Sequence, residues 1–387
     1  MFFIKEDSTV NNQTESLNEK EHHQADEFNG FDVTLEGVSK RFQDVVAVDN
    51  VSLNVIKGEF LCILGPSGCG KTTTMRLIGG FEKPDSGIIK LAGRDVTSIP
   101  PDKRNTRMVF QNYALFPHMS VYDNVAFGLR MVRVPKNQIQ EKVKESLAIV
   151  ELEGYEDRKP HQLSGGQQQR IALARAIVTQ PTVLLLDEPL GALDLKLRKQ
   201  MQIELKKIQE EVGITFIYVT HDQDESLTMA DRIAVMKDGH IEQIGTPVEI
   251  YERPVNAYVC DFVGVINMLE GVVSDNSGKN ARVKLTAGAE VQLPENEDLH
   301  EGQEVIIGIR PEKIVLSRSS IPEYPFSMPC EVGVIIYQGT HTGYTLKLPG
   351  GEEMNVMVQN LSGGESYSIN DSIYLHWTYD AIRVFPQ

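Results

Sequence analysis

One stretch constrains the fold of this chain more than any other: Gly65-Pro66-Ser67-Gly68-Cys69-Gly70-Lys71-Thr72. It fits the pattern G-x-x-x-x-G-K-S/T of a phosphate-binding loop. Residues 59–64 before it read as a short buried strand, and Thr73 begins a segment that reads as a helix. Glycines let the backbone turn its N–H groups inward, and a helix N-terminus adds partial positive charge. We therefore expect the loop to hold phosphates, with Lys71 on the β- and γ-phosphates and the Thr72 hydroxyl on Mg²⁺.

The composition narrows the classes of protein to which the chain can belong. Its length of 387 residues suits roughly two or three domains. The net charge of −16, from 38 basic and 54 acidic residues, argues against non-specific nucleic-acid binding as the main activity. The four cysteines show no metal-ligand spacing, so a reduced, intracellular setting is expected. No apolar run approaches the ~18 residues of a membrane-spanning helix.

A second motif combines a helix cap with two glycines: Leu163-Ser164-Gly165-Gly166-Gln167. Ser164 is a good N-cap, and the residues from Gln167 to Thr179 read as an amphipathic helix. A plain capped helix does not need two successive glycines, because each of them lowers helix stability. The motif therefore predicts a second helix N-terminus that recognises phosphate.

Polar side chains end two apolar strands further along the chain. Asp187 and Glu188 follow a run, residues 183–186, that is apolar throughout, as in the centre of a parallel sheet. Such sheets place ligands at the carboxyl ends of their strands. We expect Asp187 to hold Mg²⁺, directly or through water, and Glu188 to polarise an attacking water. His221 ends the strand at residues 215–220 and is a candidate to contact a γ-phosphate.

Two aromatic features allow more than one interpretation. Phe42 either stacks on adenine or packs within its sheet, and the periodicity favours neither. Gln111 opens a loop, residues 111–117, that is unusually aromatic for an exposed connection. Such a loop packs locally more often than it binds a partner.

These elements stand in the order found in the ATP-binding cassette of ABC transporters: the phosphate loop, Gln111, the motif at Leu163, the strand that ends in Glu188, and His221. The segment from about residue 31 to residue 245 resembles that cassette. Two positions depart mildly from the family pattern. Phe42 stands where Tyr is frequent, which leaves adenine stacking intact, and Gly191 stands where Ser is frequent.

The resemblance implies an α/β P-loop NTPase fold with a helical subdomain at about residues 115–165. It implies ATP and Mg²⁺ as ligands and a head-to-tail homodimer in which both copies contribute to each ATP site. The residues implied to bind nucleotide are Phe42, Gly65, Pro66, Ser67, Gly68, Cys69, Gly70, Lys71, Thr72, Thr73, Gln111, Ser164, Gly165, Gly166 and Gln167. Mg²⁺ would be held by Thr72, Gln111 and Asp187, and catalysis would depend on Glu188 as the base, His221 and Lys71.

The C-terminal part of the chain changes character and reads as short alternating strands separated by Gly, Asn and Pro turns. It predicts a small all-β barrel or sandwich. The segment from Gly308 to Glu312 resembles the transport-associated OB domain of solute-importer ATPases, which implies a dimer-stabilising or regulatory role. We expect a disordered tail at residues 1–29, the cassette at 30–262 and the OB-like domain at 263–387. A second Leu-Ser-Gly-Gly run, at Leu361, reads as a turn between strands.

Residues 245–254 and 262–268 resemble importer ATPases of the polyamine, maltose and ferric-ion group. Within that group, Ile266-Asn267-Met268 and Trp377 favour the spermidine/putrescine type. The resemblance implies the ATP-hydrolysing subunit of an importer at the cytoplasmic face of the cell membrane. Its partners would be a second copy, two transmembrane permease subunits and, indirectly, a solute-binding protein, with no nucleic acid. An importer ATPase for sugar or iron is one alternative. A soluble ABC ATPase acting on nucleic acid or ribosomes is another, although those proteins typically carry tandem cassettes or long coiled coils.

Overall fold

The computed structural model describes residues 30–387 apart from 192, 277–279, 287, 289, 295–298 and 363. The disordered tail predicted for residues 1–29 lies outside the described residues. The chain divides into two compact units, the first ending at Pro247 and the second running from Val248 to Gln387. The domain boundary expected between residues 262 and 263 stays a prediction.

The core of the first unit is a six-stranded sheet in the order β10-β9-β3-β8-β7-β6. Its strands are β3 (Phe60–Leu64), β6 (Thr106–Val109), β7 (Val183–Asp187), β8 (Thr215–Thr220), β9 (Arg232–Lys237) and β10 (His240–Gly245). Neighbouring strands are parallel, except that β10 runs antiparallel to β9. Every residue of β3 and β8 is buried, as expected for central strands covered on both faces. The carboxyl ends of β3, β7 and β8 meet at one edge, since Leu64 lies opposite Thr220 and Asp187 opposite Val219.

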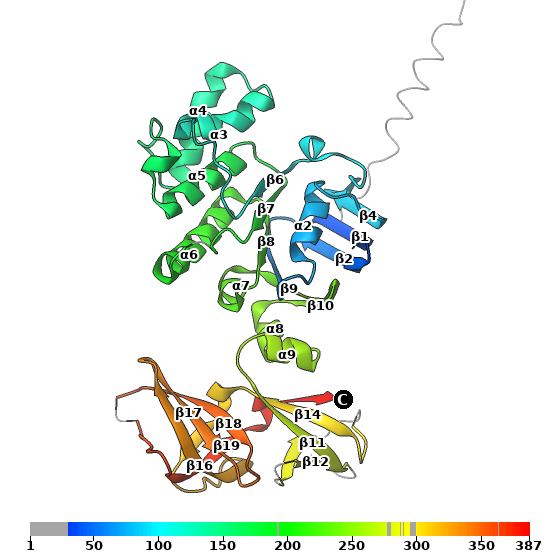
Figure 1. The fold of residues 1–387 in the computed structure, drawn as a ribbon, viewed down its shortest axis with the longest axis vertical. Coiled ribbons are helices and arrows are strands. Elements are labelled where there is room, and N and C mark those ends of the chain that lie inside the picture. Colours follow the sequence, from blue (N-terminus) through cyan, green and yellow to red (C-terminus); the bar gives the residue numbers. More distant parts are fainter. Residues whose placement is uncertain are drawn as a thin grey trace, which may run out of the picture. The chain divides into compact units, whose positions relative to one another are not determined.

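The helix α2 (Lys71–Gly79) lies between this sheet and a smaller one (Figure 1). The smaller, antiparallel sheet has the order β2-β1-β4-β5, with β1 (Phe31–Phe42), β2 (Val45–Ile56), β4 (Ser86–Leu91) and β5 (Arg94–Asp95). One hydrophobic cluster includes Leu35 of β1, Met75 of α2 and Leu185 of β7. The packing of both sheets therefore fixes the helix that follows the phosphate loop.

A buried arginine closes the C-terminal end of α2. Nη1 of Arg104 donates hydrogen bonds to the carbonyl oxygens of Leu77 and Ile78, both at 2.7 Å. The Leu77 carbonyl also accepts from the N–H of Gly80, the C-cap residue, at 3.2 Å. A positive charge is favourable at this end of the helix dipole. No local pattern in the sequence predicts these bonds, because Leu77 and Ile78 lie more than twenty residues before Arg104.

Three helices pack on one another in the first unit: α3 (Val121–Met131), α4 (Lys136–Ile149) and α5 (Gly165–Ile177). The predicted start of α5 at Gln167 is two residues too late, because Ser164 caps the helix and Gly165 and Gly166 form its first turn. Two further helices are α6 (Leu195–Val212) and α7 (Gln223–Met229). In the described part of the chain, no helix is both long and apolar enough to span a membrane.

The second unit is built mainly from two five-stranded antiparallel sheets, which confirms the predicted all-β region. One sheet has the order β13-β12-β11-β14-β20 and the other β15-β19-β16-β17-β18. The strands are β11 (Asn267–Asp275), β12 (Asn280–Leu285), β13 (Glu290–Pro294), β14 (Glu304–Ile309), β15 (Val315–Ser317), β16 (Phe326–Tyr337), β17 (His341–Lys347), β18 (Glu353–Gln359), β19 (Ser372–Trp377) and β20 (Ile382–Pro386). Two short helices precede them, α8 (Pro247–Glu252) and α9 (Ala257–Phe262).

Asn267 ties the two sheets of this unit together. Its amide nitrogen donates to the carbonyl of Asn355 at 2.8 Å, and its side-chain oxygen accepts from the Asn355 N–H at 2.7 Å. The side chain thereby pairs with the backbone of β18 from its place on β11. The turn expected at Leu361 lies between β18 and β19, although Gly363 is outside the described residues.

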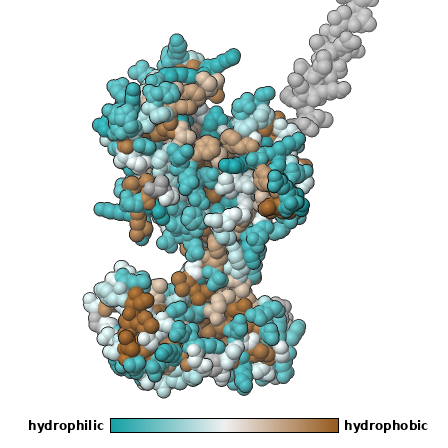
Figure 2. All heavy atoms as spheres, in the orientation of Figure 1, coloured by the Kyte–Doolittle hydropathy of each residue, from teal (hydrophilic) through white to brown (hydrophobic). Residues whose placement is uncertain are grey.

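Hydrophobic side chains gather on one exposed face of the second unit, over β16 and β17 (Figure 2). Val334 and Ile336 point outward from β16, and Ile336 is 53% exposed. Gly343 lies opposite Ile336 on β17 and presents no side chain to cover it. Contiguous apolar surface of this kind is typical of interaction sites.

We expect acid to destabilise the second unit through His376, which is buried in β19. Burial lowers the pKa of His376, so the folded chain keeps the ring neutral where the unfolded chain takes up a proton. The free energy of unfolding should therefore fall as the pH drops below ~6.5, by up to about 1.4 kcal/mol per pH unit. Fluorescence of Trp377, the only tryptophan of the chain, follows the urea unfolding of this unit.

Two single variants, one at His376 and one at His341, test whether His376 causes this pH dependence. His376→Gln should flatten the pH dependence below pH ~6.5, whereas replacement of the less buried His341 on β17 should leave it unchanged. An identical pH dependence in the wild type and His376→Gln would show that another group is responsible.

Candidate active site

The phosphate loop spans the gap between β3 and α2, and its glycines hold conformations that other residues avoid. Gly68 and Gly70 have φ angles of 83° and 108°. A Cβ atom on Gly70 would also overlap the carbonyl oxygen of Ala47. Gly70 is the N-cap of α2 and has no side chain to occupy the first N–H groups of the helix. These groups are consequently available to an anion, as the sequence predicts.

Lys71 lies over the loop that precedes it. Its ammonium group is buried and donates to the carbonyl oxygens of Gly65 and Pro66, both at 2.8 Å. These bonds hold the positive charge at the loop rather than in solvent. A phosphate in the loop would meet both this charge and the N-terminus of α2.

Thr72 and Asp187 come together from α2 and the end of β7. The Thr72 hydroxyl donates to Asp187 Oδ1 at 3.2 Å. Burial raises the pKa of Asp187, and the neighbouring charge of Glu188 raises it further, although the Thr72 bond acts in the opposite direction. A divalent cation beside Asp187 would favour its ionised form. Among the described residues, no group of three or more His, Cys, Asp and Glu side chains could hold a metal ion. Hydroxyl and carboxylate oxygens such as those of Thr72 and Asp187 are ligands that Mg²⁺ accepts.

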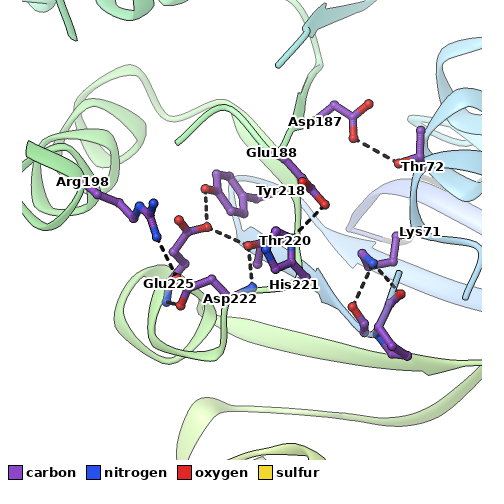
Figure 3. Close-up of polar contacts among 12 residues, drawn as sticks. Lys71, Thr72, Asp187, Glu188, Arg198, Tyr218, Thr220, His221, Asp222 and Glu225 are labelled. Carbon is purple, nitrogen blue, oxygen red and sulfur yellow. Dashed lines mark hydrogen bonds and ion pairs between the residues drawn. The ribbon is translucent and has the colours of Figure 1, made fainter. Parts of the chain in front are cut away.

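Glu188 and His221 face each other across the ends of β7 and β8 (Figure 3). His221 Nδ1 lies 3.2 Å from Glu188 Oε1. Glu188 has a φ of 44°, in the left-handed region, which costs a non-glycine residue about 1–3 kcal/mol. Its N–H nevertheless bonds to the Val219 carbonyl at 3.1 Å, which holds this turn against β8. A carboxylate on a strained backbone turn, beside a histidine at the carboxyl ends of the strands, is an arrangement that suits proton transfer.

A hydrogen-bond network supports the backbone on both sides of His221 (Figure 3). The buried carboxylate of Glu225 accepts from the hydroxyls of Tyr218 and Thr220, both at 2.7 Å. Thr220 in turn accepts from the N–H of Asp222 at 2.9 Å. Burial raises the pKa of Glu225 despite these donors. Sequence reasoning missed this network, and its only signal was the placement of Tyr218 and Thr220 on one face of β8.

Arg198 extends the same support to the loop after Glu188. Its guanidinium pairs with Asp222 Oδ2 at 3.3 Å and donates to the Leu193 carbonyl at 3.1 Å. Figure 3 shows Arg198 approaching the start of α7. The loop after the catalytic candidate Glu188 is thus tied to the residue after His221.

Gln111 lies in an exposed loop that approaches the turn after Glu188. A Cβ atom on Gly191 would stand 3.6 Å from the Gln111 amide nitrogen. The Gln111 amide therefore lies near Gly191, three residues after Glu188, and the sequence connected Gln111 with Glu188 only through the resemblance.

The motif at Ser164 forms a separate helix end. Ser164 Oγ accepts from the Gln167 N–H at 3.3 Å, and the Gln167 side chain accepts from the Ser164 N–H at 3.0 Å. This capping box leaves the N–H groups of Gly165 and Gly166 without a helical partner. In the described part of the chain, no hydrogen bond joins Ser164–Gln167 to the phosphate loop. Within one copy, the predicted site residues accordingly form two groups. One lies around the phosphate loop and Glu188, and the other is Ser164–Gln167 at the start of α5.

Phe42 ends β1 and is 43% exposed. The exposed Val45 lies opposite it on β2, and the ammonium of Lys40 stands 5.3 Å from the ring centroid. An aromatic ring with this exposure is only partly used in packing. Of the two interpretations that the sequence left open, the exposure favours stacking on a base.

Comparison with known proteins shows to which family the chain belongs. The spermidine/putrescine import ATP-binding protein PotA of Rubrobacter xylanophilus is 50% identical over 345 residues, covering 87% of this chain and 90% of that protein. The family model for ABC transporters matches residues 48–191. The chain belongs to the family of ABC transporter ATP-binding proteins. A PotA protein of Thermobifida fusca is 48% identical over 360 residues, covering 92% of this chain and 93% of the relative.

Matches elsewhere in the chain and in solved structures agree with this family. The TOBE domain model matches residues 307–385, and the MalK OB fold domain model matches 265–314. The structure of cbiO1 from Clostridium perfringens, part of the ABC transporter complex cbiONQ, has a TM-score of 0.54 at 32% identity and covers 57% of this chain and 90% of its own. A dimeric structure of MJ0796, a bacterial ABC transporter cassette, has a TM-score of 0.50 at 35% identity and covers 56% of this chain and 98% of its own. The predicted fold class, a P-loop cassette followed by an OB-like region, is confirmed.

Proposed function

We propose that the chain is the ATP-hydrolysing subunit of an ABC importer that takes up polyamines, and that ATP and Mg²⁺ are its ligands. The observation that carries the hydrolytic role is the pairing of Glu188 with His221 at 3.2 Å, beside Lys71, Thr72 and Asp187. A phosphate loop alone binds nucleotide, whereas a carboxylate base and a histidine next to it support hydrolysis.

The proposed reaction assigns one task to each side chain. Lys71 and the loop N–H groups hold the phosphates. Thr72, Gln111 and Asp187 would hold Mg²⁺, which would neutralise phosphate charge when bound. Glu188 accepts a proton from the attacking water, whose oxygen bonds to the γ-phosphorus while the bond to the bridging oxygen breaks. The products are ADP and inorganic phosphate. His221 donates a hydrogen bond that stabilises charge on the transferring group.

The separation of the two phosphate-binding helix ends supports a composite site in a homodimer. The capped N-terminus of α5 has anion-binding chemistry but no bond to the phosphate loop of its own chain in the described residues. A second copy arranged head to tail would bring Ser164, Gly165 and Gly166 to the γ-phosphate. The related MJ0796 cassette is dimeric in its solved structure, which supports this arrangement.

Two permease subunits at the cytoplasmic face of the membrane are the proposed partners of the dimer, and a solute-binding protein acts through them. An aromatic pair near Gln111 supports a docking surface there. Phe81 and Phe110 are both exposed, and their rings meet edge to face at 6.2 Å. Exposed aromatic side chains are typical anchors of protein interfaces. The exposed face of β16 and β17 supports the dimer-stabilising or regulatory role expected of the second unit.

Polyamine uptake is the direct test of the solute. Disruption of the gene for this chain should abolish uptake of labelled spermidine and putrescine, and the wild-type gene should restore it. A gene encoding Glu188→Gln should produce the protein without restoring uptake. Intact polyamine uptake with loss of sugar or iron uptake would contradict the proposed solute while leaving the ATPase role in place.

We expect Phe42→Ala to weaken ATP binding about 5- to 150-fold, since stacking on a base contributes about 1–3 kcal/mol. Phe42→Tyr should retain wild-type affinity, because the ring is preserved. Binding of a fluorescent ATP analogue to the purified chain measures both. Val45→Ala, on the neighbouring strand, serves as the control for altered apolar surface. Unchanged affinity in Phe42→Ala would indicate that the ring serves packing instead.

A further inference from the structure

The loop that follows Gln111 contains two adjacent strained residues. Tyr113 and Ala114 have φ angles of 60° and 47°, in the left-handed region that favours glycine. The N–H of Tyr113 bonds to the Phe110 carbonyl at 2.8 Å, and that of Ala114 to the Asn112 carbonyl at 2.7 Å, which makes a tight double turn. Such strain persists only where surrounding contacts over-determine the backbone, and it is concentrated at functional sites.

One side chain outside the loop holds this turn. The guanidinium of Arg175 donates to the Ala114 carbonyl at 2.7 Å and to the Tyr113 carbonyl at 2.9 Å. It also lies 5.6 Å from the ring centroid of Phe116. A planar guanidinium can satisfy two adjacent carbonyls in a fixed geometry, which a lysine ammonium cannot reproduce. Arg175 therefore bonds directly to the two residues with positive φ angles and holds the strained turn in place.

The far end of the loop has additional anchors on α3. The buried Asn124 accepts from the Phe116 N–H at 2.9 Å and donates to the Phe116 carbonyl at 3.1 Å. The Phe116 ring packs on Phe127 with centroids 4.7 Å apart. Because Asn124 and Phe127 both belong to α3, the position of α3 sets the position of this end of the loop. Arg175 sets the position of the part nearer Gln111.

Arg175 belongs to α5, the helix that begins at Gly165. Ser164 and Arg175 are eleven positions apart, which corresponds to about 16 Å along a helix. A helix is stiff over this length, so a displacement of its N-terminus also moves the guanidinium and the turn bonded to it. The two groups of predicted site residues, which share no hydrogen bond in the described residues, are linked through this side chain.

We propose that Arg175 is a positioning residue that couples the Gln111 loop to the N-terminus of α5, so that each copy links the two nucleotide sites of the dimer. This inference rests on the proposed function. In a head-to-tail pair, the α5 N-terminus of one copy serves the nucleotide of the other copy, while Gln111 serves its own. Arg175 thus connects the Gln111 loop, which contacts one nucleotide, to the α5 N-terminus, which contacts the other. Because the two sites are connected in this way, hydrolysis in the dimer is cooperative.

The test compares three forms of the full chain: wild type, Arg175→Lys and Arg170→Lys. Arg170 is a matched control on the same helix, because it pairs with Glu151 and Glu204. Within the described residues, none of its hydrogen bonds or ion pairs reaches the loop at Gln111. ATP hydrolysis is measured over a range of ATP concentrations. Arg175→Lys should lower kcat about tenfold, equivalent to ~1.4 kcal/mol, with little change in KM. Its Hill coefficient should fall to about one, while Arg170→Lys keeps the wild-type value.

Amide hydrogen exchange supplies a second measurement on the same proteins. Arg175→Lys should speed exchange at residues 112–116, and Arg170→Lys should not. Wild-type kcat and cooperativity in Arg175→Lys would overturn the inference, as would equal losses in both variants or a wild type without cooperativity. A wild type that hydrolyses no ATP would refute the proposed function, and exchange would then decide the inference. Unchanged exchange in Arg175→Lys would reject the coupling, and faster exchange confined to the loop would support it.

Discussion

Glu188→Gln should bind ATP with wild-type affinity and hydrolyse it about 10²- to 10⁴-fold more slowly, the range that a general base contributes. Glutamine has nearly the shape of glutamate but cannot accept a proton from water. Its amide can still reach His221, whose Nδ1 lies 3.2 Å from Glu188 Oε1, so the local geometry survives. Because hydrolysis separates the proposed dimer, the variant should accumulate as an ATP-bound dimer. Phosphate release measures turnover, and size-exclusion chromatography with ATP and Mg²⁺ measures the dimer.

The matched control for this variant is Glu210→Gln on the exposed side of α6, where the carboxylate makes a long pair of 4.0 Å with Lys206. It loses the same charge and should keep wild-type turnover and remain monomeric after hydrolysis. Normal turnover in Glu188→Gln would remove Glu188 from the role of base. Slow turnover without a stable dimer would instead contradict the composite site.

The predictable part of the site is encoded in short segments. The phosphate loop needs glycine at Gly70 because of its φ of 108°, and this requirement is visible as a local pattern. The strands that end in Asp187 and His221 are apolar on both faces, and the carboxyl ends of parallel strands meet at one edge. Local pattern and sheet geometry together placed Asp187 beside Thr72 without any tertiary information.

The contacts that hold these groups in place could not be predicted in this way. Arg198 pairs with Asp222 from 24 positions away, and Arg175 reaches the Tyr113 carbonyl from 62 positions away. Such pairs leave no periodic signal, since any exposed arginine on a helix has the same local pattern. The left-handed backbone of Glu188 is likewise invisible in the sequence, because glutamate rarely adopts it. Sequence therefore identifies the groups that contact substrate more readily than the groups that orient them.

Lys71→Ala should abolish ATP hydrolysis mainly by removing phosphate binding. The lysine ammonium is buried and bonded to the carbonyls of Gly65 and Pro66, so its loss removes both a charge and the two bonds that shape the loop. Hydrogen bonds to charged groups contribute about 1.5–3 kcal/mol each, so the affinity for ATP should fall at least about tenfold. Urea unfolding with and without ATP measures this. ATP at 100 times its Kd should stabilise the wild type by about 2.7 kcal/mol and the variant far less.

Two controls show whether Lys71→Ala loses ATP binding or is instead misfolded. Lys103→Ala, at an exposed position of the short helix before β6, removes the same charge and should keep the full stabilisation by ATP. Without ATP, Lys71→Ala should unfold cooperatively, because the loop lies outside the hydrophobic cluster around Met75 and Leu185, apart from Cys69. Stabilisation by ATP equal to that of the wild type, or unchanged turnover, would refute the assignment of Lys71 to the phosphates.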